Sequence, residues 1–521
     1  MTCTATTSLA IATAALVAAR IAAAGGLVVP GMGPQAQARA GAFVAKADDP
    51  TALAHNPAGF AKLDGTVAFI GANFVRMALA FARTGAYEDL PEADEPYEGL
   101  PYPEVESHPS PSPGIGGFQA VPYVAVTTDF GHPQWPVRAA IGLYSPQGYA
   151  ARAFPETVTV AGVDAPAPQR YDVFEQYGQV AHPSVALAYA ATPTLSFGAR
   201  ASWGFARIRT RKVVWAIRNY EEWIEKDSVT TIRTTDPFIP SFGLGALWSP
   251  SPAWEFGVGY ASAVHVRSKG TVRSQPGSAV PAGNANLIPI DDEFARCAPG
   301  GVEGALKICL DFDLPQTVHA GGRWIARDAG GRERADVELD VKWEQWSKAG
   351  VTTTTTDAIA ANGPLDVARI RHGFIDVVSI RLGGAYALPV AQRAVQLRAG
   401  VAWDTKTAPL SWTRVDQDGK PRATLATGVA YTADRWRIEL GGGYVWEPDR
   451  TVPDDCKPPS GPTRDDPGCQ PGGVETPVAD RSRPDPAQPL TGANNQIESP
   501  FNAGTVRSHY VLLHAGVTAW F

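Results

Sequence analysis

Cationic and aromatic side chains are interleaved in the stretch 211–226, RKVVWAIRNYEEWIEK, and this mixture suits a ligand with an apolar body and an acidic head. Apolar surface comes from Val214, Trp215, Tyr220, Trp223 and Ile224. Lys212 adds an ammonium group that can hold a carboxylate. An amphipathic helix that only packs on a neighbouring surface would have the same composition. The stretch therefore predicts either a binding surface or a structural helix.

Three arginines, Arg323, Arg398 and Arg437, lie in segments where charged and apolar residues alternate. A guanidinium can bind a carboxylate through two parallel hydrogen bonds, so each arginine is a candidate partner for an acidic ligand. The alternative is that they pair with neighbouring carboxylates such as Glu338 and Glu439. We expect mutual ion pairs for most of these side chains, with one arginine left for a ligand.

The cysteines after residue 3 form two locally spaced pairs, Cys297 with Cys309 and Cys456 with Cys469. In an exported protein such pairs predict two loop disulfides. A zinc site of four thiolates is the alternative, but the spacing lacks CxxC. The histidines also lack metal-ligand spacing, so we expect neither a metal nor a cofactor.

The elements that position these residues are strands with two unlike faces. In RADVELDVKWEQW (334–346), apolar residues from Ala335 to Trp343 alternate with charged residues from Arg334 to Glu344. Such alternation predicts a β-strand with one apolar and one polar environment. About fourteen segments of this kind, from 65–84 to 505–521, are joined alternately by short turns and long Pro- and Gly-rich loops. A stretch of threonines, Thr352–Thr356, is interpreted as loop.

This arrangement predicts an all-β fold: a transmembrane antiparallel β-barrel in the bacterial outer membrane, in contact with outer-membrane lipids. Because an Arg or Lys facing lipid at mid-bilayer costs roughly 2–4 kcal/mol, the central charges of the strands must face the lumen. The net charge of −7 argues against nucleic acid as a partner. No GxSxG or nucleotide-binding motif occurs in the 521 residues.

The chain begins with an apolar, small-residue segment, 1–24, that is interpreted as a signal peptide. Residues 25–63 are irregular and rich in Gly and Ala, and residues 64–521 carry the strands. The irregular part contains Asp48 and Asp49, followed by Asn56-Pro57-Ala58-Gly59. These residues resemble the N-terminal plug of the FadL/TodX family of outer-membrane transporters for long-chain fatty acids and aromatic hydrocarbons. The segments 254–270, 310–324 and 341–350 also resemble strand sequences of that family.

The resemblance implies an N-terminal plug (hatch) in the lumen and a hydrophobic external groove at 211–226. It also implies an inward kink at Gly142, Pro146 and Gly148 that opens the wall laterally, although the same residues could simply end a strand. The final strand ends on Phe521, which resembles the signal read by the barrel assembly machinery.

The predicted function is passive, plug-gated uptake of hydrophobic small molecules, long-chain fatty acids or aromatic hydrocarbons, by a monomer. The ligand would bind at the external groove and leave through the wall. Two alternatives remain at this point: an outer-membrane barrel enzyme of the lipase or esterase kind, and an open diffusion porin.

Overall fold

The computed structural model describes residues 31–89, 94–108, 114–115, 117–145, 151–214, 224–277, 287–289, 306–356, 358–360, 363–364, 367–390, 393–453 and 503–521. No helix among these residues is long and apolar enough to span a membrane. The signal-peptide prediction for residues 1–24 lies outside the described ranges.

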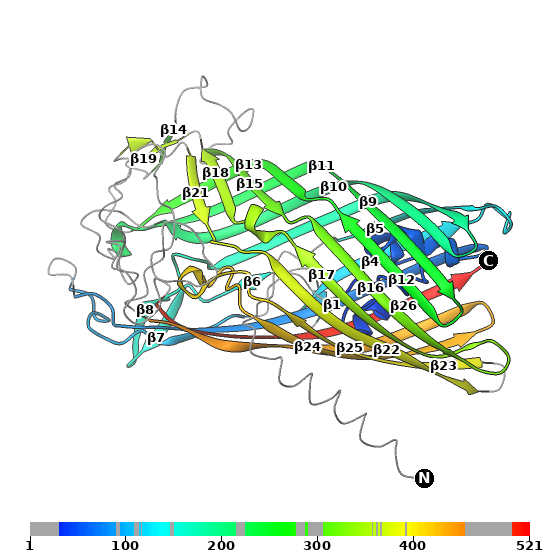
Figure 1. Ribbon diagram of the computed structural model, residues 1–521. Helices are drawn as coiled ribbons and strands as arrows, with labels where there is room; N and C mark the ends of the chain where they lie inside the picture. The colour runs from blue at the N-terminus through cyan, green and yellow to red at the C-terminus, as the bar shows by residue number, and fades with distance from the viewer. Residues whose placement is uncertain are drawn as a thin grey trace, which may run out of the picture.

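Fourteen antiparallel strands form a closed barrel, in agreement with the predicted fold (Figure 1). The strands are β1 (Thr66–Arg83), β4 (Phe118–Thr128), β5 (Val137–Tyr144), β9 (Glu175–Thr192), β10 (Leu195–Val214), β11 (Ser228–Ser251), β12 (Trp254–Ala261), β16 (Thr317–Arg327), β17 (Glu333–Glu344), β22 (Val377–Val390), β23 (Arg393–Asp404), β24 (Arg422–Ala433), β25 (Trp436–Val452) and β26 (Gly504–Trp520). The barrel closes where β1 pairs with β26, from Val67 opposite Trp520 to Arg83 opposite Gly504.

The wall continues upward, towards the end with the long connections, through four further strands: β13 (Val264–Pro276), β15 (Leu306–Leu314), β18 (Val351–Thr356) and β21 (Val367–Arg371). The same sheet includes β2 (Glu104–Glu106), β3 (Gly114–Ile115) and β6 (Arg152–Ala153). Two small sheets lie beside it, formed by β7 (Thr157–Val160) with β8 (Val163–Pro166), and by β14 (Leu287–Pro289), β19 (Ala358–Ala360) and β20 (Gly363–Pro364).

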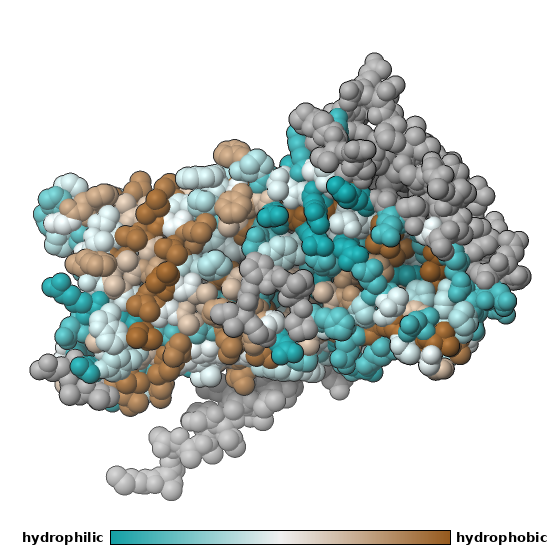
Figure 2. All heavy atoms as spheres, turned by 180° about the vertical axis from the view of Figure 1, so that it is seen from behind, coloured by the Kyte–Doolittle hydropathy of each residue, from teal (hydrophilic) through white to brown (hydrophobic). Residues whose placement is uncertain are grey.

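The alternation in the sequence places apolar side chains outside the barrel and charged side chains inside it. On β17, Leu339 is 53% exposed on the outer face, whereas Glu338 and Asp340 are fully buried. The same pattern on neighbouring strands produces a band of apolar side chains around the half of the barrel nearer the short turns (Figure 2). Towards the other end, hydrophilic residues predominate on the face shown, with smaller apolar patches among them. A bilayer therefore fits around the short-turn half of the wall.

Residues 31–63, called here the N-terminal segment, lie within the barrel near the end where the C-terminus emerges (Figure 1). The segment contains two short helices, α2 (Pro34–Ala38) and α3 (Ala52–His55), and a 3₁₀ helix, η1 (Pro57–Lys62). Three other 3₁₀ turns are found in connections: η2 (Ile224–Lys226), η4 (Trp346–Lys348) and η5 (Leu410–Trp412). Most side chains of the segment are buried, although it is too rich in Ala and Gly to form a core of its own.

Strand lengths in the upper wall differ from those expected. β10 extends to Val214 and β11 begins at Ser228, so residues 211–214 belong to the wall and not to a loop. The threonines 352–356 also belong to a strand, β18, which pairs with β15 and β21. Beyond the membrane both faces of a strand meet polar surroundings, so the period of two that reveals a half-buried strand is weakened there.

Candidate ligand-binding lumen

The residues Asn56-Pro57-Ala58-Gly59 seat the N-terminal segment against β10 and β11. The side-chain amide of Asn56 donates to the carbonyls of Val44 (2.8 Å) and Ala246 (3.1 Å), and its Oδ1 accepts from the Ala58 N–H at 3.2 Å. The wall opposite carries glycine: a Cβ at Gly198 would lie 2.2 Å from the Ala58 nitrogen. Asn56 therefore both caps η1 and ties the segment to the wall.

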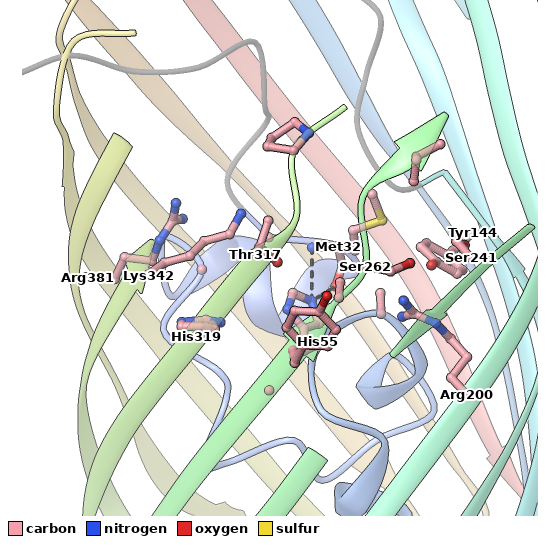
Figure 3. Close-up of a pocket in the computed structure, with 18 residues that line it drawn as sticks. Met32, His55, Tyr144, Arg200, Ser241, Ser262, Thr317, His319, Lys342 and Arg381 are labelled. Carbon is pink, nitrogen blue, oxygen red and sulfur yellow. Dashed lines mark hydrogen bonds between the residues drawn. The ribbon is translucent and has the colours of Figure 1, made fainter. Parts of the chain in front are cut away.

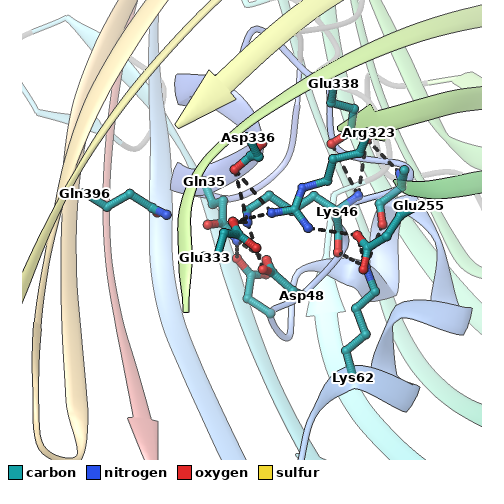
Figure 4. A network of polar contacts seen from close by, with 12 residues as sticks. Gln35, Lys46, Asp48, Lys62, Glu255, Arg323, Glu333, Asp336, Glu338 and Gln396 are labelled. Atoms are coloured by element: carbon teal, nitrogen blue, oxygen red, sulfur yellow. Dashed lines mark hydrogen bonds and ion pairs between the residues drawn. The ribbon is translucent and has the colours of Figure 1, made fainter. Parts of the chain in front are cut away.

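A ladder of carboxylates on β17 holds the first part of the segment (Figure 4). Arg39 places its guanidinium 2.6 Å from Asp336 and 3.0 Å from Glu338. Asp340 accepts hydrogen bonds from the backbone N–H groups of Phe43 (2.8 Å) and Val44 (3.2 Å). All three carboxylates are buried, and the segment supplies donors to each of them, in addition to Arg323 and His319 of the wall, which contact Asp336 and Asp340.

Close backbone approach is possible because the wall lacks side chains where the segment passes. A Cβ at Gly400 would lie 2.2 Å from the carbonyl carbon of Arg39, and one at Gly245 would lie 2.0 Å from Asn56 Oδ1. Alanine at either position would push the segment out of its seat.

Three of the four predicted carboxylate partners are engaged by carboxylates of the protein itself. Arg323 contacts Glu255 (2.8 Å), Asp336 (3.3 Å) and Glu333. Arg398 pairs with Glu439, and Arg437 lies 3.3 Å from Glu439 and 3.5 Å from Asp49.

The fourth, Lys212, is a buried side chain near the upper end of β10. None of the four lines the pocket described below. Whether any of them binds a ligand stays a prediction.

The titratable groups of the segment respond strongly to their burial in the lumen. Burial raises the pKa of Asp49 to about 6, and the neighbouring Glu439 adds to the rise. Burial favours a higher pKa for Asp48 too, but Lys46 and Arg323 hold that pKa well below its usual range. Burial lowers the pKa of His55 to about 3. At neutral pH His55 is therefore uncharged, and its Nε2 lies within hydrogen-bond distance of the Met32 backbone.

A pocket lies between the N-terminal segment and the inner wall (Figure 3). Met32 and His55 lie at its centre, with Lys342 and Arg381 on one side and Arg200 with Tyr144 on the other. Its apolar lining comes from Met32, Ala54, Tyr144, Tyr260, Val264 and Pro315. No described residue that lines the pocket carries a carboxylate. The pocket thus combines apolar surface with three cations, two of which also contact carboxylates outside the lining.

The three pocket cations differ in how firmly they are held. Arg200 donates to the Leu53 carbonyl at 2.5 Å and stacks on Tyr144, 4.8 Å from the ring centre. Arg381 donates to the Ala40 carbonyl at 3.1 Å and lies 3.0 Å from Asp404. Both arginines therefore help to seat the segment. Lys342 contacts only its neighbour on the same face of β17, Glu344, at 2.9 Å among the described residues.

A second obstruction fills the upper lumen. The connection between β23 and β24, residues 405–421, folds inward, where Arg414 lies 2.9 Å from Asp172. Val415 packs in an apolar cluster with Phe81, Phe154 and Val506. The lumen is therefore occupied at two heights, by the N-terminal segment below and by this connection above.

The predicted external groove falls mostly outside the described ranges, which end at Val214 and resume at Ile224. Ile224 packs beside Tyr87, Tyr97 and Ala165.

Cys309 lies in β15 and forms a disulfide. Cys297, Cys456 and Cys469 lie outside the described ranges, so the predicted pairing stays a prediction. Phe521, the predicted assembly signal, is exposed next to the seam between β1 and β26.

The described part of the wall is interrupted above β5. This strand has only 8 residues and ends at Tyr144, whereas β9 beside it has 18. Within the described ranges, residues 120–123 of β4 and 177–181 of β9 have no ladder partner on the side facing β5. Gly142 packs on Leu53 of the segment, since a Cβ there would lie 2.7 Å from Leu53 Cδ2. Pro146 and Gly148 lie outside the described ranges.

The pocket residues were not predicted from the sequence. They come from eight strands, two short connections and three parts of the N-terminal segment, and only the barrel register brings them together. Lys342 was recognised as a lumen-facing charge of β17, and that is the one signal in the sequence that points to this pocket.

Comparison with known proteins agrees with this architecture. Residues 15–458 match the family described as outer membrane protein transport protein (OMPP1/FadL/TodX). A search of curated proteins finds no match.

Among solved structures, the chain resembles a FadL homologue of Pseudomonas aeruginosa, with 15% identity, a TM-score of 0.66, and coverage of 95% of this chain and 100% of that one. It also resembles the toluene transporter TbuX of Ralstonia pickettii, with 13% identity, a TM-score of 0.59, and coverage of 95% and 99%. The toluene transporter TodX of P. putida matches with 13% identity, a TM-score of 0.57, and the same coverage. At these identities the structures support the fold alone, whereas the family match extends over most of the sequence. The chain therefore belongs to the OMPP1/FadL/TodX family of outer-membrane transporters of hydrophobic compounds, which are channels and not enzymes.

Proposed function

We propose that this protein takes up amphipathic molecules with an apolar body and a carboxylate or similar acceptor head, and that the lumenal pocket holds them. The observation that carries this proposal is the pocket lining, which combines apolar side chains with Arg200, Lys342 and Arg381 and has no carboxylate among its described residues. A cation in a poorly hydrated site binds an anionic head more strongly than it would in water. Such a lining favours an acid over a pure hydrocarbon.

The proposed exit is the region above β5. Within the described ranges, β5 ends there and no longer pairs with β4 on one side and β9 on the other. A molecule leaving there would pass directly into lipid and would not have to cross water with its apolar body exposed. Leu53 of the segment contacts Gly142 of β5, so a shift of the segment would change the lower border of this region.

Gating by the N-terminal segment is part of the same proposal. The segment and the connection 405–421 both occupy the lumen, an arrangement that favours a selective carrier over an open porin. The sequence contains no nucleotide-binding motif, so we propose that transport follows the concentration gradient and needs only local movement of the segment.

The test compares ligand binding in Lys342→Met with that in wild type, using a long-chain fatty acid and an alkane of the same length. Because a charge-assisted hydrogen bond contributes about 1.5–3 kcal/mol, affinity for the acid should fall about tenfold or more. Affinity for the alkane should change little. Fluorescent-ligand displacement on the purified protein measures both.

Two further variants make the test specific. Lys348→Met removes an exposed lysine near the same strand and should leave both affinities unchanged. Lys342→Arg keeps the charge and should retain acid binding. Equal losses for acid and alkane in Lys342→Met, or no loss at all, would contradict the assignment of the pocket.

A further inference from the structure

The outer face of the upper wall carries a compact group of cations. Three strands are adjacent there, and their registers place Arg207 opposite Thr235 and Thr235 opposite Lys269. The next row contains Arg209, Arg233 and Thr271, and the row above it contains Arg211, Thr231 and Arg273. Six of these nine outward positions are thus Arg or Lys, and the other three are Thr. These nine residues are called the cationic grid.

The grid begins directly above the apolar band. Below it on β10, the outward residues are Trp203 and Phe205, which are 50% and 44% exposed, and on β11 they are Phe238 and Phe242, which are 65% and 48% exposed. Exposed aromatic side chains of this kind mark the boundary between hydrocarbon and headgroups. The cationic grid therefore lies at the height of lipid headgroups, on the side of the barrel that carries the long loops.

Acidic neighbours lie along both edges of the grid and not at its centre, with Asp311 of β15 attracting Lys269 on one side. Arg209 lies 3.3 Å from Glu175, and Arg211 lies 2.7 Å from Glu156. Nothing among the described residues forms an ion pair with Arg207, Arg233, Lys269 or Arg273. Below Lys269 on β13, Arg267 is already held by Asp313 at 2.8 Å. The centre of the grid therefore keeps an uncompensated positive charge.

One cross-strand pair in the grid is unfavourable by itself. Arg209 and Arg233 are direct register partners, and like charges opposite one another on a sheet are destabilising. An anion bound between them would remove this repulsion. Neighbouring strands lie about 4.8 Å apart and same-face residues about 6.7 Å apart, so one multiply charged group can contact several cations at once.

We propose that the cationic grid binds the phosphate groups of a phosphorylated glycolipid in the outer leaflet of the membrane. The guanidinium and ammonium groups contact phosphate oxygens, and the threonine hydroxyls provide further donors. The acyl chains of the same lipid lie against the aromatic residues directly below. The site is separate from the lumen and does not depend on the transported ligand.

The experiment measures binding of diphosphoryl lipid A to the full-length protein in detergent by native mass spectrometry. The variant Arg207→Gln/Arg233→Gln/Lys269→Gln should bind at least about tenfold more weakly than wild type, since each basic residue near a headgroup contributes to the attraction. The matched control Arg332→Gln/Arg393→Gln/Arg435→Gln removes three exposed cations at the short-turn end and should bind as wild type does.

Further measurements separate this site from general electrostatic attraction and from a structural role. Lipid A without its phosphates should bind weakly and equally to all variants, and inorganic phosphate at matched phosphate concentration should not displace the phosphorylated lipid. Arg233→Gln alone removes the like-charge pair, so it should weaken lipid binding without lowering thermal stability. Three results would overturn the proposal: unchanged lipid binding in the triple variant, binding of the dephosphorylated lipid to wild type as strong as that of the phosphorylated lipid, or displacement of the phosphorylated lipid by inorganic phosphate.

Discussion

Two regions of this barrel are rich in charge, and they handle it in opposite ways. Around the N-terminal segment, Asp336 and Glu338 point inward, are buried, and meet Arg39 and other cations at short distances. In the cationic grid, Arg207 and Arg233 point outward, are exposed, and have no ionic partner in the described parts of the chain. The same alternation of side chains gives both results, because the surroundings of the outer face change from lipid to water along a strand.

The difference shows what each set of charges contributes. Buried charges must be paired or they cost free energy, so the inner network fixes the position of the segment. Exposed charges need no partner in the protein and remain available to something outside it. Three changes test this contrast.

The largest effect is expected from Asp336→Asn, which leaves Arg39, Lys46 and Arg323 with too little negative charge. Breaking a buried ion pair costs about 3–5 kcal/mol. The equilibrium constant for seating the segment in the lumen should therefore fall more than a hundredfold. Planar-bilayer recordings should then show frequent opening events. Asp328→Asn, at an exposed turn, is the matched control and should behave as wild type. If the two variants gave the same conductance, the inner network would not hold the segment.

A smaller effect is expected from Leu339→Arg, which places a charge on the lipid face of β17 midway between Ala335 and Trp343. The expected cost is about 2–4 kcal/mol, measured as a shift of guanidinium unfolding in lipid vesicles. The control Thr235→Arg adds a charge to the cationic grid, above the apolar band, and should shift unfolding far less. Similar shifts for both would mean that the band is placed wrongly on the wall.

The smallest expected effect is that of pH on the equilibrium between the seated and the released segment. His55 and Asp49 contribute to it with opposite signs. The pKa of His55 falls from 6.5 to about 3 when the segment is seated, so acidification below pH 6.5 favours release. The pKa of Asp49 rises from 3.8 to about 6, so acidification from pH 6 towards 4 favours the seated state.

Conductance measured between pH 7 and 4 in single variants separates these contributions. Asp49→Asn removes the Asp49 contribution, so opening should increase more than in wild type as the pH falls. His55→Gln removes the His55 contribution, so opening should increase less than in wild type, or decrease, as the pH falls. The slope in either variant is at most tenfold per pH unit for one proton, and it is smaller close to either pKa, where the two states differ by less than one proton. Identical pH profiles in the two variants would contradict both assignments.

The sequence contains most of the information about the wall and little about the pocket. Alternation in segments such as 334–346 predicts the strands, the closed barrel and the inward direction of Asp336, Glu338 and Asp340, all of which the structure has. The outward direction of Arg207 and Arg233 does not follow from alternation alone, because the rule that charges face the lumen holds only where lipid covers the outer face. The pocket needs Arg200, Lys342 and Arg381 to meet across the barrel, and their distances depend on strand register, which no local pattern specifies.

The glycines of the inner wall have a consequence for variation within such proteins. A Cβ at Gly198 or Gly400 would lie within 2.2 Å of backbone atoms of the segment, so the wall is moulded to one particular path of that chain. Exchanging residues 31–63 for the corresponding stretch of a relative would therefore require the matching wall positions to be exchanged with it. Substitutions in the segment and in the facing wall therefore depend on one another, and we expect the two sequences to change together.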